Sequence, residues 1–298
     1  MKKLINTYIL LFFAVIMVNA QTETEAPEKD KPVRPPFESG IIIDNQTSVI
    51  PTKNTLEMHI QHRFGIIKSN GSSDLWGIYA PSANTRMGFN FSITNNIMIG
   101  YGITRKNMYN DFQAKWTILQ QTRKNTIPLT VSVYGNLAID GQKKAAFGDD
   151  YSFSDRLSYF SQIIVGRKFS ESFSAELNAS FTHYNTMTAI VENVKGYDHD
   201  VVGIGGHLRF KFSPQSSVLL MYTHPLYIKQ MSENNEILNT WNSNFGIGYE
   251  VSTSTHAFQI FISTANGIVP QDIYMFNTDD WTDTEVRFGF NITRLWSF

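Results

Sequence analysis

The side chains of this sequence that could do chemistry stand at alternate positions of segments whose other positions are mostly apolar. They are Glu57, His59, Arg63, Arg86, Asp111, Lys115, Glu176, His207, Arg209, Lys211, Glu250 and Arg287. If each segment is a β-strand, these side chains share one face of a sheet, because successive side chains point to opposite faces. Charges that line a water-filled path select ions by sign. Opposite charges can equally pair across a narrow lumen and fill it, and the sequence leaves both interpretations open.

Catalysis and metal binding have weaker support. The histidines are scattered over several segments and no Gly-x-Ser-x-Gly motif occurs, whereas a Ser–His pair needs hydrogen-bond contact. Acidic runs occur at residues 198–200 and 279–285, but calcium needs six or more converging oxygens, and short acidic runs in loops are more often solvated. Cysteine is absent, which excludes disulfides and thiolate metal sites. We therefore expect no enzyme activity, no metal and no cofactor.

Period-two alternation recurs along the chain and predicts the strands that carry these side chains. In the last segment, Phe288, Phe290 and Ile292 alternate with Arg287 and Asn291, which gives one apolar and one polar face. About twelve such segments follow residue 55. Two segments depart from the pattern: residues 157–169, where a bulge is one explanation, and residues 218–222, whose facing is unclear.

The connections between these strands alternate between short and long. Short turns are expected at residues 94–96, 120–126, 170–172, 213–216 and 252–255. Loops are expected at residues 65–84, 105–108, 140–152, 184–198, 223–240 and 265–284, and all but 105–108 are long. Such sorting is typical of a membrane barrel, whereas a soluble β-sandwich needs no systematic asymmetry. Aromatic residues at strand ends, among them Trp116 and Trp241, suit the two membrane interfaces. The predicted fold class is all-β: a transmembrane, antiparallel, up-and-down β-barrel of about twelve strands.

The N-terminal part of the sequence predicts export. Lys2 and Lys3 precede an apolar stretch, and Ala20 is the small residue before a cut, so residues 1–20 have the pattern of a cleaved signal peptide. Residues 21–54 are polar and rich in Pro and Glu, which predicts a flexible periplasmic segment, with a short ordered part at residues 41–43 and 49–50 in the barrel mouth. Residues 55–298 form the expected barrel. We expect it in the outer membrane of a Gram-negative cell, with both termini in the periplasm.

The final strand bears on the partners of the protein. Phe290, Trp296 and the terminal Phe298 resemble the sorting signal of bacterial outer-membrane barrels. The resemblance implies recognition by the barrel-assembly machinery and a location among outer-membrane lipids. Charge is nearly balanced, with 25 Lys and Arg against 26 Asp and Glu, which argues against a nucleic-acid partner.

Three stretches carry a resemblance to a known family. They are LEMHIQHRFG at residues 56–65, GFNFSITNNIMIGYGITRKN at 88–107 and THAFQIFISTANGI at 255–268. With these motifs the chain resembles a family of outer-membrane β-barrel proteins of unknown function from Bacteroidetes-type bacteria. The resemblance runs over most of the mature chain and implies location and fold, and it brings no catalytic residues.

The function expected from the sequence is passive passage of ions or a small polar solute. Lumen residues such as Arg63, Arg86, Lys115 and Arg209 would set the selectivity of such a pore. A barrel of eight strands is filled by side chains, and one of 16 to 18 strands leaves a channel. A count of twelve lies between these cases, so it does not show whether the lumen is open. The alternative is a sealed structural barrel whose outer loops bind a partner, and a membrane enzyme comes third.

Overall fold

The computed structural model describes residues 30–67, 75, 77–186, 199–226, 228 and 241–298. The chain divides into two compact units, Met1–Lys31 and Pro32–Phe298. The expected signal peptide, residues 1–20, lies outside the described residues. In the described part of the chain no helix is long and apolar enough to cross a bilayer.

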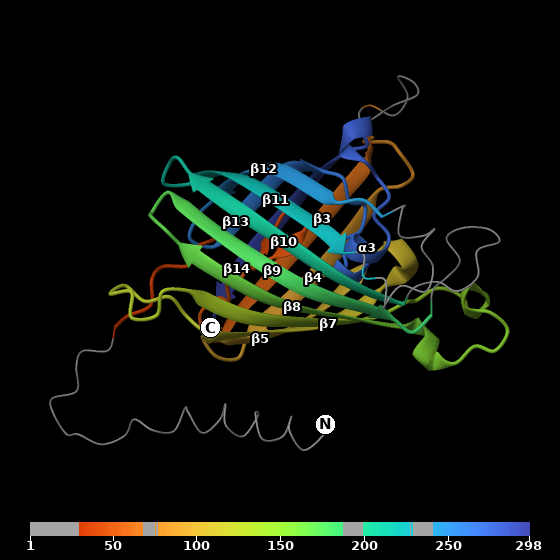
Figure 1. Ribbon diagram of the computed structural model, residues 1–298, viewed down its shortest axis with the longest axis horizontal. Coiled ribbons are helices and arrows are strands. Elements are labelled where there is room, and N and C mark those ends of the chain that lie inside the picture. The colour runs from red at the N-terminus through yellow and green to blue at the C-terminus, as the bar shows by residue number, and fades with distance from the viewer. Residues whose placement is uncertain (1–29, 68–74, 76, 187–198, 227, 229–240) are drawn as a thin grey trace, which may run out of the picture. The chain divides into compact units, whose positions relative to one another are not determined.

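Within the described residues of the second unit, twelve antiparallel strands close into a barrel (Figure 1). They are β3 (Thr55–Ile66), β4 (Asn84–Ser92), β5 (Ile97–Thr104), β6 (Asn110–Leu119), β7 (Thr130–Ile139), β8 (Leu157–Lys168), β9 (Phe173–Tyr184), β10 (Asp200–Lys211), β11 (Ser216–Leu226), β12 (Asn244–Ser252), β13 (His256–Ser263) and β14 (Arg287–Ser297). Strands adjacent in sequence pair with each other, and β14 pairs with β3 to close the ring. The predicted fold class is confirmed.

The two ends of the barrel differ in the connections that they carry. The short turns, such as residues 93–96 between β4 and β5, lie at the same end as the start of β3 and the C-terminus, on the left in Figure 1. We call this the turn end and the opposite one the loop end. Four short 3-10 helices lie in the described parts of the loops: η1 (Lys106–Met108), η2 (Lys144–Phe147), η3 (Phe153–Arg156) and η4 (Trp281–Asp283).

Two strands whose pattern was ambiguous are regular in the structure. β8 pairs with β7 and β9 without a register shift, and its buried face carries Phe160 and Ile164. β11 likewise buries Leu219 and Met221. The expected bulge in β8 is therefore wrong, because its departure from alternation comes from apolar side chains that point inward. Register shifts occur instead in β6 and near Gly289 in β14.

Two stretches outside the wall strands run in part inside the ring. The first, residues 32–54, contains a small hairpin of β1 (Ile41–Ile42) and β2 (Asn45–Gln46). The second is the connection between β13 and β14, residues 264–286, which contains the helix α3 (Pro270–Met275), in contact with β8, β9, β10 and β11. We call them the N-terminal plug and the loop plug. The sequence suggested a largely flexible segment and an external loop at these positions. The ordered part expected at residues 41–43 is present, whereas the order of the neighbouring plug residues and the inward position of the loop were not expected; apolar residues of each stretch find apolar partners on the inner wall.

The loop plug depends on a glycine in the wall. A Cβ atom on Gly203 of β10 would collide with the ring of Tyr274 in α3. Replacing Gly203 by Ala should therefore push α3 away from the wall and lower the free energy of unfolding by about 1–3 kcal/mol, the usual cost of overpacking. Urea unfolding in detergent measures this loss, and protease cleavage between β13 and β14 should become faster.

Gly135 of β7 is the matched control, because the nearest atom to its added Cβ is the Phe160 carbonyl oxygen at 3.9 Å. Gly135→Ala should leave both measurements nearly unchanged. Equal effects of the two substitutions would contradict the packing of Tyr274 on Gly203.

Candidate functional site

The twelve side chains expected on the polar face belong to wall strands and lie inside the barrel. Eleven of them are buried, and Lys211, near the turn end, keeps 29% of its side chain exposed. In a water-filled lumen such side chains would remain accessible. They are buried because the two plugs occupy the space around them.

The N-terminal plug is anchored by an apolar cluster. Phe37, Ile42 and Ile43 of the plug pack with Phe261 of β13 and with the two inward apolar residues of β11. Glycines make room for the tip of the plug: a Cβ on Gly246 would lie 2.9 Å from Ile43. The sequence predicted a short ordered part at residues 41–43, and the ordered stretch extends beyond it to Phe37, because burying these side chains offsets the entropy lost on ordering them.

The tip of the plug is held in a strained conformation. Ile43 has a φ of 52°, a region that β-branched residues rarely adopt. Three side chains of the wall fix its backbone: Arg63 and Asn291 donate hydrogen bonds to its carbonyl oxygen, and Gln259 accepts one from its N–H. Such a conformation persists only where the surroundings enforce it.

Carboxylates of the plug neutralise cations of the wall. The Arg63 guanidinium lies 2.6 Å from the Asp44 carboxylate, and both side chains are shielded from solvent. The Arg63 side chain also lies over the ring of Phe261, at 4.5 Å from its centroid. Nearer the turn end, Arg209 lies 2.6 Å from Glu38 of the plug and 3.1 Å from Glu250 of β12. A buried charge has to be paired, and here the plug supplies part of the pairing.

Carboxylates of the wall bind the backbone of the plug. Glu57 accepts a hydrogen bond from the Gly40 N–H at 3.2 Å, and Lys115 donates one to the Gly40 carbonyl oxygen at 3.0 Å. His59 lies 3.1 Å from Glu57. These residues account for the polar groups of a buried plug segment that has little regular structure.

A second carboxylate–histidine pair holds the other side of the plug. Glu176 of β9 lies 2.8 Å from His207 of β10 and accepts a hydrogen bond from the Ser48 N–H at 3.0 Å. The Ser48 hydroxyl also donates to Glu176. The serine therefore contacts the carboxylate and not the imidazole, so the three side chains are not in the order of a catalytic triad.

The ion pair of Arg86 and Asp111 involves no residue of either plug. Arg86 of β4 donates two hydrogen bonds to Asp111 of β6, at 2.9 and 2.6 Å, and a third to Gln61 at 3.1 Å. Asn136 of β7 donates to the same carboxylate. The geometry is bidentate, which is the strongest arrangement of such a pair.

The loop plug closes the loop end in a similar way. Asp272 of α3 accepts hydrogen bonds from the hydroxyls of Tyr109 and Tyr184, at 3.1 and 2.9 Å, and lies 3.1 Å from the Lys106 ammonium. Tyr274 stacks on Phe160, with 5.6 Å between the ring centroids. No role was predicted for these residues from their positions in the sequence. The only feature of the sequence that pointed to this packing was the apolar residues of β8 that face the lumen.

The acidic run at residues 279–285 has a structural role at two of its members. Asp279 lies 2.6 Å from Arg287 of β14, although burial raises the pKa of the Asp279 carboxyl above its ordinary value. Asp280 accepts a hydrogen bond from the Thr282 N–H, which lowers the pKa of the Asp280 carboxyl. Among the described residues no group of three His, Asp or Glu side chains is placed to hold a metal ion, and residue 198 lies outside them.

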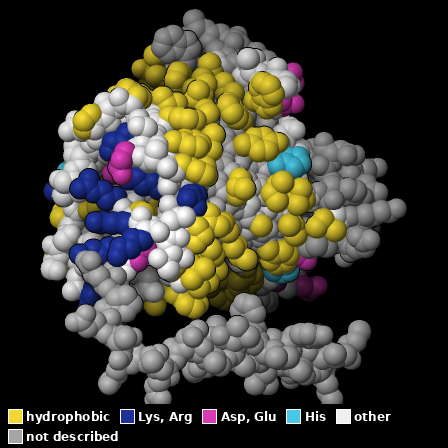
Figure 2. Space-filling view, turned by 60° about the vertical axis from the view of Figure 1, so that its left-hand side comes forward, with side chains coloured by type: hydrophobic (Ala, Val, Ile, Leu, Met, Phe, Trp, Pro, Cys, Tyr) yellow, Lys and Arg dark blue, Asp and Glu magenta, His cyan; other side chains and the backbone are white. Residues whose placement is uncertain are grey.

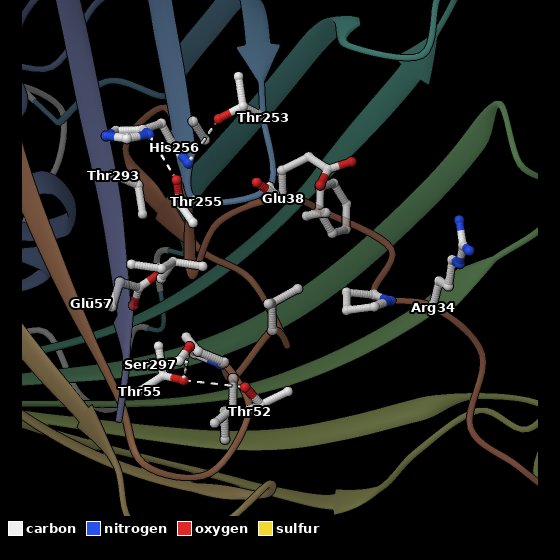
Figure 3. A pocket seen from close by; sticks show the side chains of 18 of the residues that line it. Arg34, Glu38, Thr52, Thr55, Glu57, Thr253, Thr255, His256, Thr293 and Ser297 are labelled. Atoms are coloured by element: carbon white, nitrogen blue, oxygen red, sulfur yellow. Dashed lines mark hydrogen bonds between the residues drawn. The ribbon is translucent and has the colours of Figure 1, made fainter.

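A cavity of about 440 Å³ opens beside the N-terminal plug at the turn end. Its wall includes the plug residues Arg34 and Glu38, Arg209 and Lys211 of β10, and Lys168 at the end of β8. Figure 3 shows that hydroxyl-bearing side chains from β3, β14 and the turn before β13 also border it. The described lumen is thus occupied through its middle, and this polar hollow remains at one mouth.

The outer face of the barrel is apolar. Figure 2 shows a broad hydrophobic band over the strands, with Lys and Arg side chains gathered at one end. The band includes Phe89, Ile99, Phe112 and Trp116, all well exposed. Trp241 was expected at an interface but is buried in the cluster around α3, because the loop plug offers it an apolar surface.

The final strand contains the three residues of the predicted sorting signal. Phe290 and Trp296 are half-buried, and Phe298 is 82% exposed. Their recognition by the assembly machinery stays a prediction.

An exposed apolar band around a closed ring of strands is the arrangement of a membrane barrel, because hydrocarbon leaves no water to satisfy an open edge. Residues 37–296 match the family model described as membrane-bound beta barrel domain (DUF5777). The chain belongs to this family. The matched span starts within the N-terminal plug, so the membrane-bound barrel domain includes most of the plug.

Solved structures with a similar fold include porins and channels. The NanC porin is 7% identical, with a TM-score of 0.49, over 82% of this chain and 99% of that one. An outer membrane channel from Pseudomonas putida F1 is 10% identical, with a TM-score of 0.48, over 84% and 97%. The KdgM porin is 5% identical, with a TM-score of 0.46, over 82% and 99%. No curated protein matches the sequence. Likeness at these identities concerns the fold and not the function.

The pairing of Arg63 with Asp44 gives a stability prediction for the barrel domain. Asp44→Ala leaves the buried guanidinium without its counter-charge and should lower the free energy of unfolding by about 3–5 kcal/mol. The double variant Asp44→Leu with Arg63→Met removes both charges and should recover much of that loss. Urea unfolding in detergent measures all three proteins.

Glu171→Ala is the control, because Glu171 forms an ion pair with Lys168 at the turn end in which the carboxylate is exposed. An exposed pair contributes little, so the midpoint should hardly move. If Asp44→Ala behaved like this control, the Arg63–Asp44 pair would not anchor the plug.

Proposed function

We propose that this protein is an outer-membrane pore for small anions, closed in the described conformation by its own plugs. The observation that carries the proposal is that arginines of the barrel wall are paired with carboxylates of the plugs. Arg63 is paired with Asp44 of the N-terminal plug, Arg287 is paired with Asp279 of the loop plug, and Arg209 shares Glu38 and Glu250. In the closed state carboxylates of the plugs occupy positions that permeating anions could take.

The charge of the bare wall supports anion selectivity. Of the twelve lumen residues, six are Lys or Arg and four are Asp or Glu. Without the plugs, Arg63 and Arg287 lose their carboxylates and the lumen carries a positive surplus. Rings of positive side chains favour anions in a pore.

The N-terminal plug has features of a removable element. It precedes β3, and its covalent connection to the wall strands runs through residues 52–54. Its tip at Ile43 is strained, and leaving the lumen would release that strain. Its exit would also remove the Ile43 side chain from the space beside Gly246. The lumen of the twelve-stranded ring would then be wider than in the closed state.

The membrane placement is part of the proposal. The turn end, with both termini, faces the periplasm and the loop end faces the exterior, as in barrels whose long loops are extracellular. The apolar outer band supports insertion in the outer membrane of a Gram-negative cell, of Bacteroidetes type by the resemblance of its motifs. An epitope tag in residues 140–156 should be accessible on intact cells, and one in residues 120–129 only after permeabilisation. The reverse result would overturn the orientation.

Planar-bilayer recording tests the pore. The mature chain should give little conductance, and a variant that lacks residues 32–50 and also, because α3 lies in the lumen, residues 267–278 should give unitary steps with a reversal potential that indicates preference for chloride over potassium. Because the deletion removes buried contacts, Ile43→Asp provides a second route: it places a charge in the apolar cluster and should raise the open fraction. Lys53→Asp, at an exposed position of the same segment, is the control.

Each result decides one part of the proposal. Deletion and Ile43→Asp proteins that keep the heat-modifiable migration of a folded barrel, yet stay silent, would refute the pore. Conducting variants that prefer potassium would refute the anion selectivity. A mature chain that conducts as well as the deletion variant would refute closure by the plug.

The second candidate is a permanently sealed barrel whose loops bind a partner. It is favoured by the apolar cluster of Phe37, Ile42 and Ile43 in the lumen, which makes withdrawal of the plug costly. Folded but silent plug variants are the outcome that would establish it over the pore.

A further inference from the structure

The cavity at the turn end has the size and the walls of a small-molecule site. Its volume is about 440 Å³, which falls within the usual range for ligand pockets. Seven parts of the chain form it: the N-terminal plug, β3, the end of β8 with the turn that follows it, β10, the turn between β12 and β13, β13, and β14. The cavity lies at the mouth of the barrel, beside the segment that closes the lumen.

The polar groups of the cavity are mostly cations and hydroxyls. Arg34, Lys168, Arg209 and Lys211 contribute positive charge. The hydroxyl-bearing residues on the walls are Thr52, Thr55, Thr253, Ser254, Thr255, Thr293 and Ser297. In Figure 3 three of these, Thr52, Thr55 and Ser297, form one chain of hydrogen bonds along the cavity. Hydroxyls act as both donors and acceptors, so they suit a hydroxylated solute.

The acidic side chains of the cavity do not cancel this positive character. Glu171 is hydrogen-bonded to Lys168, which lowers the pKa of the Glu171 carboxyl, and Arg34 and Lys211 lower it further. Glu57 is already bound by His59 and the plug backbone. The lining thus holds four cationic side chains against three carboxylates, and each of these carboxylates already has a partner.

Glu38 shows that Arg209 and Lys211 can bind a carboxylate. Its carboxylate lies 2.6 Å from the Arg209 guanidinium and 3.6 Å from the Lys211 ammonium, and its side chain is 33% exposed towards the hollow. Arg209 retains a second, buried carboxylate partner in Glu250, so the guanidinium stays paired if Glu38 moves away. The Glu38 carboxylate is thus an intramolecular ligand that a solute carboxylate can replace.

We propose that this cavity binds a small hydroxylated carboxylate, which takes the place of Glu38 between Arg209 and Lys211. The inference deepens the proposed anion pore, on which its biological role rests, by naming the class of solute and the mouth at which it binds. Release of Glu38 removes the ion pairs that link the plug to β10 two residues before Gly40, and leaves the hydrogen bond from Arg209 to the Pro36 carbonyl oxygen and the contact of Phe37 with His207. Binding at the mouth therefore weakens the closed state.

Isothermal titration of the detergent-solubilised mature protein tests binding without requiring conductance. D-glucuronate is the probe, and D-glucose, which lacks the carboxylate, is the matched control ligand. We expect D-glucuronate to bind and D-glucose not to bind. Binding should weaken as sodium chloride is raised from low to high concentration, because salt screens the cations.

Two variants move the affinity in opposite directions. Glu38→Gln removes the internal competitor and should tighten D-glucuronate binding about three- to fivefold, as expected for a partly exposed ion pair. Lys211→Gln removes a ligand-binding cation and should weaken binding about tenfold. Lys53→Gln, at the same end but outside the cavity, is the control and should bind like the wild type.

The outcomes separate this site from the pore. Glucose binding as strong as that of glucuronate, or inorganic phosphate binding as strong as both, would refute recognition of the carboxylate. A Glu38→Gln variant that binds glucuronate more weakly would refute the competition. Glucuronate binding with the predicted variant effects, together with silent plug variants, would keep the site and reject the pore.

Discussion

A charge enclosed in a barrel has to find its counter-charge nearby, because transferring an unpaired charge out of water costs several kcal/mol. The wall of this barrel satisfies that requirement only in part. Arg86 and Asp111 pair within the wall, whereas Arg63 and Arg287 depend on carboxylates from the two plugs. The wall and the plugs therefore depend on each other. The charged residues of the wall fix the position of each plug, and the carboxylates of the plugs neutralise cations of the wall that would otherwise be buried without a partner.

The wall could be predicted from the sequence because its two environments impose a strict alternation. Hydrocarbon outside and polar surroundings inside leave each strand one apolar and one polar face, as β4 and β14 show. The short and long connections then ordered the strands into a ring. The inward position of all twelve candidate residues followed from the same rule, since it needs no knowledge of what fills the lumen.

The plugs could not be predicted in this way, because their partners are far apart in sequence. Residues 32–54 and 264–286 have no period of their own, and their order comes from contacts with several strands at once. The sequence held one indication of the plugs, namely apolar residues on the polar face of two strands: Leu219, Met221, Phe160 and Ile164. Such residues would be unfavourable in a water-filled lumen and therefore indicate an apolar partner inside the barrel. The sequence showed them as ambiguous strands, and the missing information was the surface against which they pack.

The closing seam between β3 and β14 sets an order of assembly. The ring joins the first wall strand to the last, so the lumen is not enclosed until the whole chain has been synthesised. Arg63 lies on this seam, in contact with Asn291 across it and with Asp44 inside it. Ile43, at the turn of the β1–β2 hairpin, accepts hydrogen bonds from both strands of the seam, so the plug bridges the two edges that meet when the ring closes.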